Sequence, residues 1–128
     1  MSKQEIKDPE RTAGSGAYSP AVEADGWVFV SGQGPLDIKS GAVVNGSIEE
    51  QTKLVLSHIE RILRNAGCGL KDVVKSTVHL ADIGDFSRFN AAYREAFKDA
   101  LPLPARTTVQ SVLWGGMKIE IDVVARKP

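Results

Sequence analysis

The sequence has little of several residue types, and each shortage excludes a class of protein. One cysteine, Cys68, occurs among 128 residues, so the chain cannot form an internal disulfide. The two histidines, His58 and His79, form no zinc-ligand pattern, so we do not expect a metal. No run of about 18 apolar residues is present, and the polar start MSKQEIKDPER lacks the apolar centre of a secretory signal. We therefore expect a cytoplasmic protein without a membrane span.

The charges of the chain balance. The sequence contains sixteen Lys and Arg residues and sixteen Asp and Glu residues, and it has no basic block. We therefore do not expect nucleic acid as a partner. A length of 128 residues with 42% hydrophobic content fits one compact domain, 1–128. Within it we expect residues 1–13 to form a flexible or loosely packed segment.

The first half of the chain predicts a hairpin followed by a helix. In AVEADGWVFVS, residues 21–31, Asp25-Gly26 separates two short runs rich in valine and aromatic residues, which is a hairpin signal. The glycine-rich stretch 32–46 should form a loop. Ser47 precedes Glu50 by three residues, a capping box that begins a helix. The helix should bury one face and end at a glycine, as shown by Ile48, Val55, Ile59, Ile62, Ala66 and Gly67.

The second half predicts a strand, a helix and a second hairpin. DVVKSTVHL, residues 72–80, is typical of a strand. A helix should begin near Asp85 and bury the aromatic residues Phe86, Phe89, Tyr93 and Phe97. Two alternating runs, 105–113 and 117–125, flank the sequence WGGM and predict a hairpin. The order β-β-α-β-α-β-β indicates an α+β domain with two helices on one face of a mixed sheet.

This architecture leaves the other face of the sheet without helices. The run RTTVQSV, residues 106–112, places polar side chains on one face of its strand and mixed ones on the other. A sheet covered on one side only either exposes its second face to water or packs it against another subunit. We therefore expect an oligomer.

Six segments in the same order along the chain resemble the YjgF/RidA family, and together they span nearly the whole sequence. They are GAYSPAV (16–22), VFVSGQGPLD (28–37), EEQTKLVLSHIERILRNAG (49–67), DVVKSTVHLADIGDFSRFNAAYREAF (72–97), PARTTVQ (104–110) and KIEIDVVA (118–125). The resemblance implies a chorismate-mutase-like fold and a homotrimer with sites between subunits. It also implies cofactor-free deamination of 2-imino or enamino acids, such as 2-iminopropanoate and 2-iminobutanoate, to 2-oxo acids and ammonia.

The resemblance also assigns site residues. Arg106 matches the arginine that holds the substrate carboxylate, and Glu120 matches the acid that positions water. The matching pocket residues are Tyr18, Ser31, Gly32, Asn90 and Thr108. Thr108 stands where many members have cysteine. Ala17, Pro20 and the turn LWGGM also depart from the family pattern, and these departures bear on substrate preference.

The chemistry of the two charged residues agrees with those roles. A guanidinium offers a planar fork of donors that matches a carboxylate, and Arg106 follows two prolines that restrict its backbone. Glu120 can orient water or take its proton. Simpler interpretations remain for each residue: a surface ion pair for Arg106, neutralisation of Lys118 for Glu120, packing for Tyr18, and helix-backbone hydrogen bonding for Asn90. We expect His58 to be solvated and His79 to be structural.

Counting along the second hairpin gives a further prediction. With a two-residue loop, Glu120 faces Ser111 and lies roughly 16 Å from Arg106. If both residues serve one site, they should therefore come from different subunits. The alternative to an enzyme is a non-catalytic trimer that binds small carboxylates or proteins, as a sensor or chaperone. A third possibility, endoribonuclease activity, is disfavoured by the zero net charge.

Overall fold

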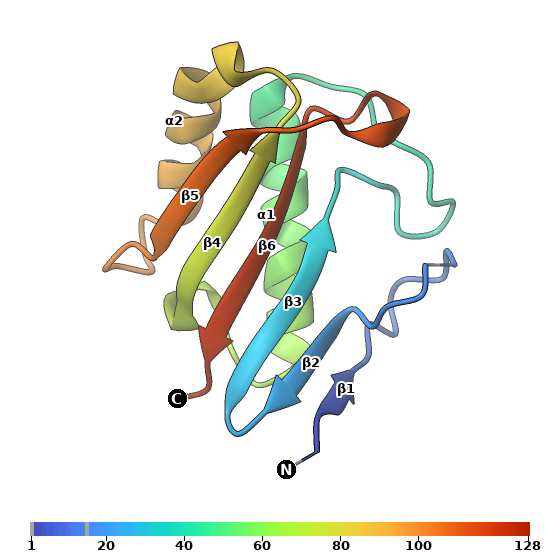
Figure 1. The fold of residues 1–128 in the computed structure, drawn as a ribbon, viewed down its shortest axis with the longest axis vertical. Helices are drawn as coiled ribbons and strands as arrows, with labels where there is room; N and C mark the ends of the chain where they lie inside the picture. Colours follow the sequence, from blue (N-terminus) through green and yellow to red (C-terminus); the bar gives the residue numbers. More distant parts are fainter. Residues whose placement is uncertain (1, 15) are drawn as a thin grey trace.

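The computed structural model describes residues 2–14 and 16–128, which form a six-stranded mixed sheet with two helices on one face (Figure 1). The strands lie in the order β1-β2-β3-β6-β4-β5. The predicted α+β architecture, with two helices covering one side of the sheet, is confirmed. Within the described residues, neither helix combines the length and apolarity that crossing a membrane requires.

The N-terminal part of the sheet contains the predicted hairpin and one strand that we did not predict. Strands β2 (Ala21–Ala24) and β3 (Trp27–Gln33) pair antiparallel through a turn in which Asp25 and Gly26 have φ values of 54° and 81°. Two residues with positive φ match the twist of a hairpin. Strand β1 (Gln4–Ile6) pairs with β2 at the sheet edge. Its three residues contain one apolar position, which is too little pattern to indicate a strand.

Helix α1 (Ile48–Asn65) begins and ends where the sequence predicts. The Ser47 Oγ accepts a hydrogen bond from the Glu50 backbone N–H at 3.1 Å, and the Glu50 carboxylate accepts one from the Ser47 N–H at 2.9 Å. The helix ends just before Gly67, which has a φ of 78°. Its buried face includes Val55, Ile59, Ile62 and Leu63. This face packs against β3 and β6 and forms the core of the domain.

The predicted second hairpin is wrong. Strand β4 (Val73–Leu80) lies between β5 (Ala105–Gln110) and β6 (Ile119–Arg126), pairing parallel with β5 and antiparallel with β6. The chain leaves β5 and passes through a 3₁₀ turn at Trp114–Gly116 before it enters β6. Burial explains why β6 pairs with β3 and β4 instead of forming a hairpin with β5. Four apolar residues that alternate along β6 are almost fully buried, so this strand takes a central position. The more polar β5 takes the edge. The four are Ile119, Ile121, Val123 and Ala125.

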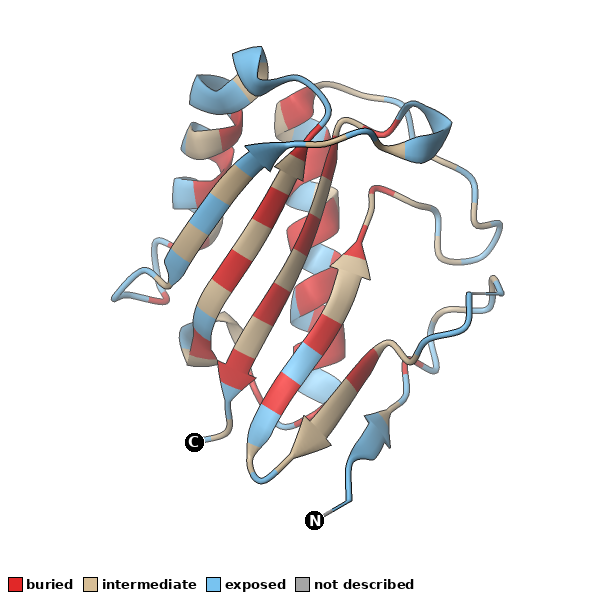
Figure 2. Ribbon diagram, viewed as in Figure 1, coloured by how far each residue is buried: buried red, intermediate tan, exposed pale blue. Residues whose placement is uncertain are grey.

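The two faces of the sheet differ in burial. Along the central strands, buried residues alternate with partly exposed ones (Figure 2). Helix α2 (Phe86–Ala96) lies with α1 over the buried face. On the face away from the helices, Trp27 and Phe29 of β3 and Val109 of β5 remain 40%, 46% and 39% exposed. Large apolar side chains are thus present on the face that the described helices leave open.

Candidate functional site

Arg106 lies on the helix side of β5, where its side chain rests on aromatic rings of α2. Its register partner in β4 is the buried Ser76, whose hydroxyl hydrogen-bonds the Tyr93 hydroxyl at 2.7 Å. The guanidinium carbon lies 5.6, 5.1 and 4.8 Å from the ring centres of Phe86, Phe89 and Tyr93. Cations are attracted to such ring faces. Phe89 and Tyr93 are buried as predicted, whereas Phe86 is 37% exposed, which corrects the expectation that the helix buries it. All three rings lie beside the arginine that we predicted to bind a carboxylate.

A hollow of about 320 Å³ opens beside Arg106. It is lined by Asn90, Tyr93, Arg94, Leu103, Pro104 and Arg106. The structure thus brings the predicted residues Arg106 and Asn90 together. Thr108 lies two positions further along β5 on the same face, half-buried opposite Val78, and is outside this lining. Across residues 2–14 and 16–128, no acidic side chain forms an ion pair with Arg106.

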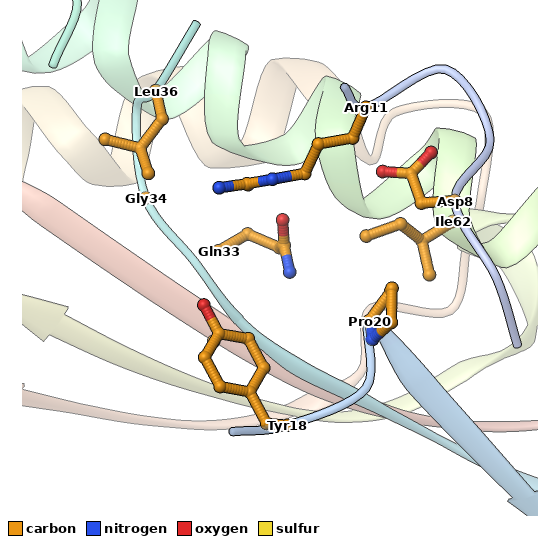
Figure 3. Close-up of a pocket in the computed structure, with 9 residues that line it drawn as sticks. Asp8, Arg11, Tyr18, Pro20, Gln33, Gly34, Leu36 and Ile62 are labelled. Carbon is orange, nitrogen blue, oxygen red and sulfur yellow. The ribbon is translucent and has the colours of Figure 1, made fainter. Parts of the chain in front are cut away.

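Tyr18 and Gly32 line a second, smaller cavity of about 40 Å³ at the other side of the molecule, together with Gln33 (Figure 3). The Tyr18 side chain is 55% exposed and stands outside the hydrophobic core. Gln33 is buried and donates a hydrogen bond from Nε2 to the Ser31 carbonyl at 3.0 Å. The sequence analysis missed Gln33. Its position within SGQ, directly after two predicted site residues, was the available signal.

Glu120 stands next to Gly32, on the open face of the sheet. Between Val30 and Gln33 the register of β3 against β6 shifts by one residue, which is a bulge of the kind often found beside active sites. A Cβ on Gly32 would lie 2.6 Å from the Glu120 Oε2, so the carboxylate needs a glycine here. Glu120 does not pair with Lys118, whose Nζ donates to the Gly46 carbonyl.

Ser31 connects this region to the segment that carries Tyr18. Its Oγ donates a hydrogen bond to the Ser19 carbonyl at 2.6 Å, and its backbone N–H donates to the Pro20 carbonyl at 3.0 Å. Both bonds fasten β3 to residues 19 and 20. Four predicted residues, Tyr18, Ser31, Gly32 and Glu120, therefore form a second group at some distance from Arg106 and Asn90.

The two groups do not meet within one chain. Arg106 is in register with Ser76 and through it with Val123 of β6, whereas Glu120 lies three positions away along β6. An odd offset places the Glu120 side chain on the opposite face of the sheet. Strand β4 also separates β5 from β6, the strand of Glu120, by about 10 Å, and β3, which carries Ser31 and Gly32, lies about 14 Å from β5. Our count along a hairpin rested on a wrong pairing, but the two residues are far apart for these other reasons.

His58 contradicts the expectation that it is solvated. It is buried one helical turn after Val55, on the apolar face of α1. Its Nε2 lies 2.8 Å from the Leu36 carbonyl, which requires a proton there, and its Nδ1 accepts from Arg61 at 2.9 Å. Arg61 in turn pairs with the buried Asp8 at 2.8 Å. Burial lowers the pKa of His58, so the ring is neutral in this network.

His79 lies on the open face, opposite Glu120 in the β4–β6 register. Its Nδ1 hydrogen-bonds the Ser111 Oγ at 2.8 Å, and its Nε2 lies 3.8 Å from the Asp122 Oδ2. Partial burial raises the pKa of Asp122. In the part of the chain that the structure describes, no group of three or more His, Cys, Asp or Glu side chains is arranged to hold a metal ion.

These features define an α+β domain with candidate polar side chains in two separate halves of the molecule. One half offers a guanidinium held on aromatic rings, and the other offers a carboxylate beside an exposed tyrosine and a bulged strand. Such groups suit a small polar molecule containing an acid. Such an arrangement is typical of a domain that binds small molecules.

Comparison with known proteins places this domain in a family. Residues 9–127 match the family described as Endoribonuclease L-PSP. A RutC family protein of Pyrococcus abyssi is 41% identical over 99% of both chains. The human 2-iminobutanoate/2-iminopropanoate deaminase is 43% identical over 86% of this chain and 80% of its own length. The crystal structure of Escherichia coli TdcF with bound serine superposes with a TM-score of 0.89 at 28% identity, covering 98% of this chain and 99% of TdcF. The chain belongs to the Endoribonuclease L-PSP family, which includes the YjgF/RidA proteins.

Proposed function

We propose that this protein hydrolyses 2-imino acids to 2-oxo acids and ammonia. Water adds across the C=N bond, and the resulting amino alcohol loses ammonia to leave the C=O group. The observation that carries the proposal is the Arg106 guanidinium, held on three rings beside an open hollow that no described acid lines. The deaminase name of the human relative supports the same reaction.

Arg106 binds the carboxylate of the substrate in this proposal. The rings of Phe86, Phe89 and Tyr93 cover one side of the guanidinium, which leaves the N–H groups at its edge for two parallel hydrogen bonds to an acid. The buried hydrogen bond between Tyr93 and Ser76 holds the ring nearest to Arg106. A fixed guanidinium places the imine carbon at one position, which lowers the entropic cost of the attack by water.

Glu120 positions the attacking water. A carboxylate next to the backbone of Gly32 can accept a hydrogen bond from water and take its proton as the C–O bond forms. A protonated imine is already electrophilic, so the reaction requires no covalent nucleophile. The proton then moves to the nitrogen, which leaves as ammonia.

The two halves combine across a subunit boundary in a homotrimer. Arg106 and Glu120 lie on opposite faces of one sheet, so one chain alone cannot present both to a small substrate. A neighbouring chain that packs on the open face can bring its Glu120, Tyr18 and Gly32 towards the Arg106 pocket. The exposed Trp27 and Phe29 give that face the apolar area that an interface needs.

A coupled assay tests the activity. A threonine dehydratase supplies 2-iminobutanoate, and semicarbazide captures the imine that the protein has not yet hydrolysed. We expect the wild type to suppress semicarbazone formation, and Arg106→Ala to reduce kcat/KM by about 100-fold, because charge-assisted bonds to a carboxylate contribute about 3 kcal/mol. Arg64→Ala is the control, because Arg64 is an exposed arginine in the last turn of α1 that does not line the hollow and lies away from the open face of the sheet.

The same assay separates catalysis from binding alone. If the wild type and Arg106→Ala consume imine equally slowly while both remain folded by circular dichroism, the protein is no deaminase. Binding of small 2-oxo acids that Arg106→Ala abolishes would then support a non-catalytic carboxylate receptor.

A further inference from the structure

The hollow beside Arg106 contains a second arginine that the reaction proposed above does not use. Arg94 lies one helical turn after Asn90 in α2, so both side chains occur on the same side of the helix. Leu103 and Pro104 complete the wall around them. Arg94 is exposed, whereas Arg106 is half-buried. The lining therefore combines one half-buried and one exposed arginine.

The charge of this hollow is unbalanced. Its lining contains two arginines and no acidic residue. Two other arginines are ion-paired, Arg61 with Asp8 and Arg88 with Glu49, both at distances below 3 Å. No carboxylate of residues 2–14 or 16–128 lies within 4 Å of either guanidinium in the hollow. One substrate carboxylate would compensate only one of the two charges.

The hollow has a volume of about 320 Å³, which leaves space beside the carboxylate that Arg106 would bind. A five-carbon acid with a carboxylate at each end carries one anionic group for each of the two arginines. The apolar surface of Leu103 and Pro104 suits the methylene groups between them.

We infer that Arg94 makes this protein selective for 2-imino acids with a second carboxylate, of four or five carbons, such as iminosuccinate and 2-iminoglutarate. This inference rests on the proposed deaminase function. Arg106 binds the carboxylate next to the imine, and Arg94 binds the distal one. Water replaces the imine nitrogen as before, giving a 2-oxo dicarboxylate and ammonia. The substrate must come from a reaction that oxidises the amino group of an acidic amino acid to an imine.

A comparison of two substrates tests the role of Arg94. Amino-acid oxidases with catalase generate 2-iminoglutarate from glutamate and 2-iminopropanoate from alanine, and semicarbazide reports the residual imine. The decisive quantity is the ratio of kcat/KM for the dicarboxylate to kcat/KM for the monocarboxylate. We expect Arg94→Gln to lower this ratio three- to fivefold, the modest effect of a solvent-exposed ion pair, mainly through KM. Arg94→Lys should retain part of the ratio.

Arg64→Gln provides the matched control, because Arg64 is an exposed arginine in the last turn of the other helix, α1. It should leave the ratio unchanged. Calorimetric binding of 2-oxoglutarate and 2-oxobutanoate gives the same comparison without turnover. Here too Arg94→Gln should weaken the dicarboxylate three- to fivefold relative to the monocarboxylate.

The outcomes separate this inference from the function on which it rests. An unchanged ratio in Arg94→Gln, with the wild type active on 2-iminopropanoate, overturns the role of Arg94 and leaves the deaminase intact. An equal loss on both substrates, with a smaller mass by light scattering, assigns Arg94 to a subunit contact and also overturns it. A wild type inactive on both substrates overturns the deaminase itself.

Discussion

At the scale of the single residue, the proposed chemistry depends on the glycine at position 32 as much as on the charged residues. Gly32 leaves the Glu120 carboxylate room beside the backbone of β3. The bulge that carries Gly32 and Ser31 has one more residue than the facing stretch of β6, which pushes this part of β3 outwards. The position of Glu120 is therefore set by the strand opposite.

Gly32→Ala should reduce activity with little effect on folding. The new Cβ would lie 2.6 Å from the Glu120 Oε2, and the carboxylate is the flexible end of its side chain, so it moves away. We expect kcat to fall at least about tenfold, part of the 10²- to 10⁴-fold contribution of a well-placed base. Semicarbazide competition and a thermal melt measure the two effects.

Gly69→Ala serves as the control for that substitution, because a Cβ on Gly69 meets no atom within 4 Å. Equal kcat values for the wild type and Gly32→Ala would show that Glu120 does not act from its position beside Gly32.

At the scale of the element, one buried network fastens three segments together. Asp8 belongs to the N-terminal segment, Arg61 and His58 belong to α1, and Leu36 belongs to the loop after β3. This loop also lines the small cavity beside Tyr18. The network thus connects the body of the domain to the half-site that contains Tyr18.

The network should make stability dependent on pH. Burial lowers the pKa of His58 below its ordinary value of 6.5, and a proton on Nδ1 would place a second donor against the Arg61 guanidinium. The stabilisation is complete above about pH 6.5 and is lost as the pH falls through the lower pKa of the folded state. One proton gives a slope of at most about 1.4 kcal/mol per pH unit.

His58→Gln removes this titration while an amide N–H can still donate to Leu36. We expect urea unfolding between pH 7.5 and 5.0 to show a steeper loss of stability for the wild type than for the variant. The difference between the two proteins cancels other groups, including Asp122, whose raised pKa acts in the opposite direction. Parallel curves would mean that His58 is not the responsible group.

At the scale of the whole molecule, the open face of the sheet connects fold to function. Its exposed Trp27, Phe29 and Val109 lie on the face away from both helices. The alternation of side chains along β3 and β6 places Glu120, the residue proposed to position water, on that same face. An assembly that covers the apolar residues would therefore also bring Glu120 against a neighbouring chain.

We expect the protein in solution to have a mass of about 41 kDa, three times the 13.8 kDa of one chain. Phe29→Glu should shift it towards the monomer and remove most of the proposed deaminase activity, because we propose a site divided between chains. Ser57→Glu adds the same charge to the exposed surface of α1 and should change neither property. Light scattering and the semicarbazide assay measure both. A fully active monomer would contradict the divided site.

The sequence alone determined the local structure of this protein. The Ser47–Glu50 capping box, the Asp25-Gly26 turn and the spacing of apolar residues in α1 depend on neighbours a few positions apart, so they can be recognised from the chain. The resemblance of PARTTVQ to the YjgF/RidA family likewise predicts a carboxylate-binding role for Arg106, and that role stays a prediction.

Only the tertiary structure decided how these elements meet. Strand β6 sits between β3 and β4 because its alternating apolar side chains need burial from both sides, and no local signal distinguishes that from a hairpin with β5. Arg94 joins the hollow of Arg106, and His58 joins Asp8, through contacts between residues distant in sequence. Such pairings depend on which faces the folded chain buries together, and this is a property of the whole domain.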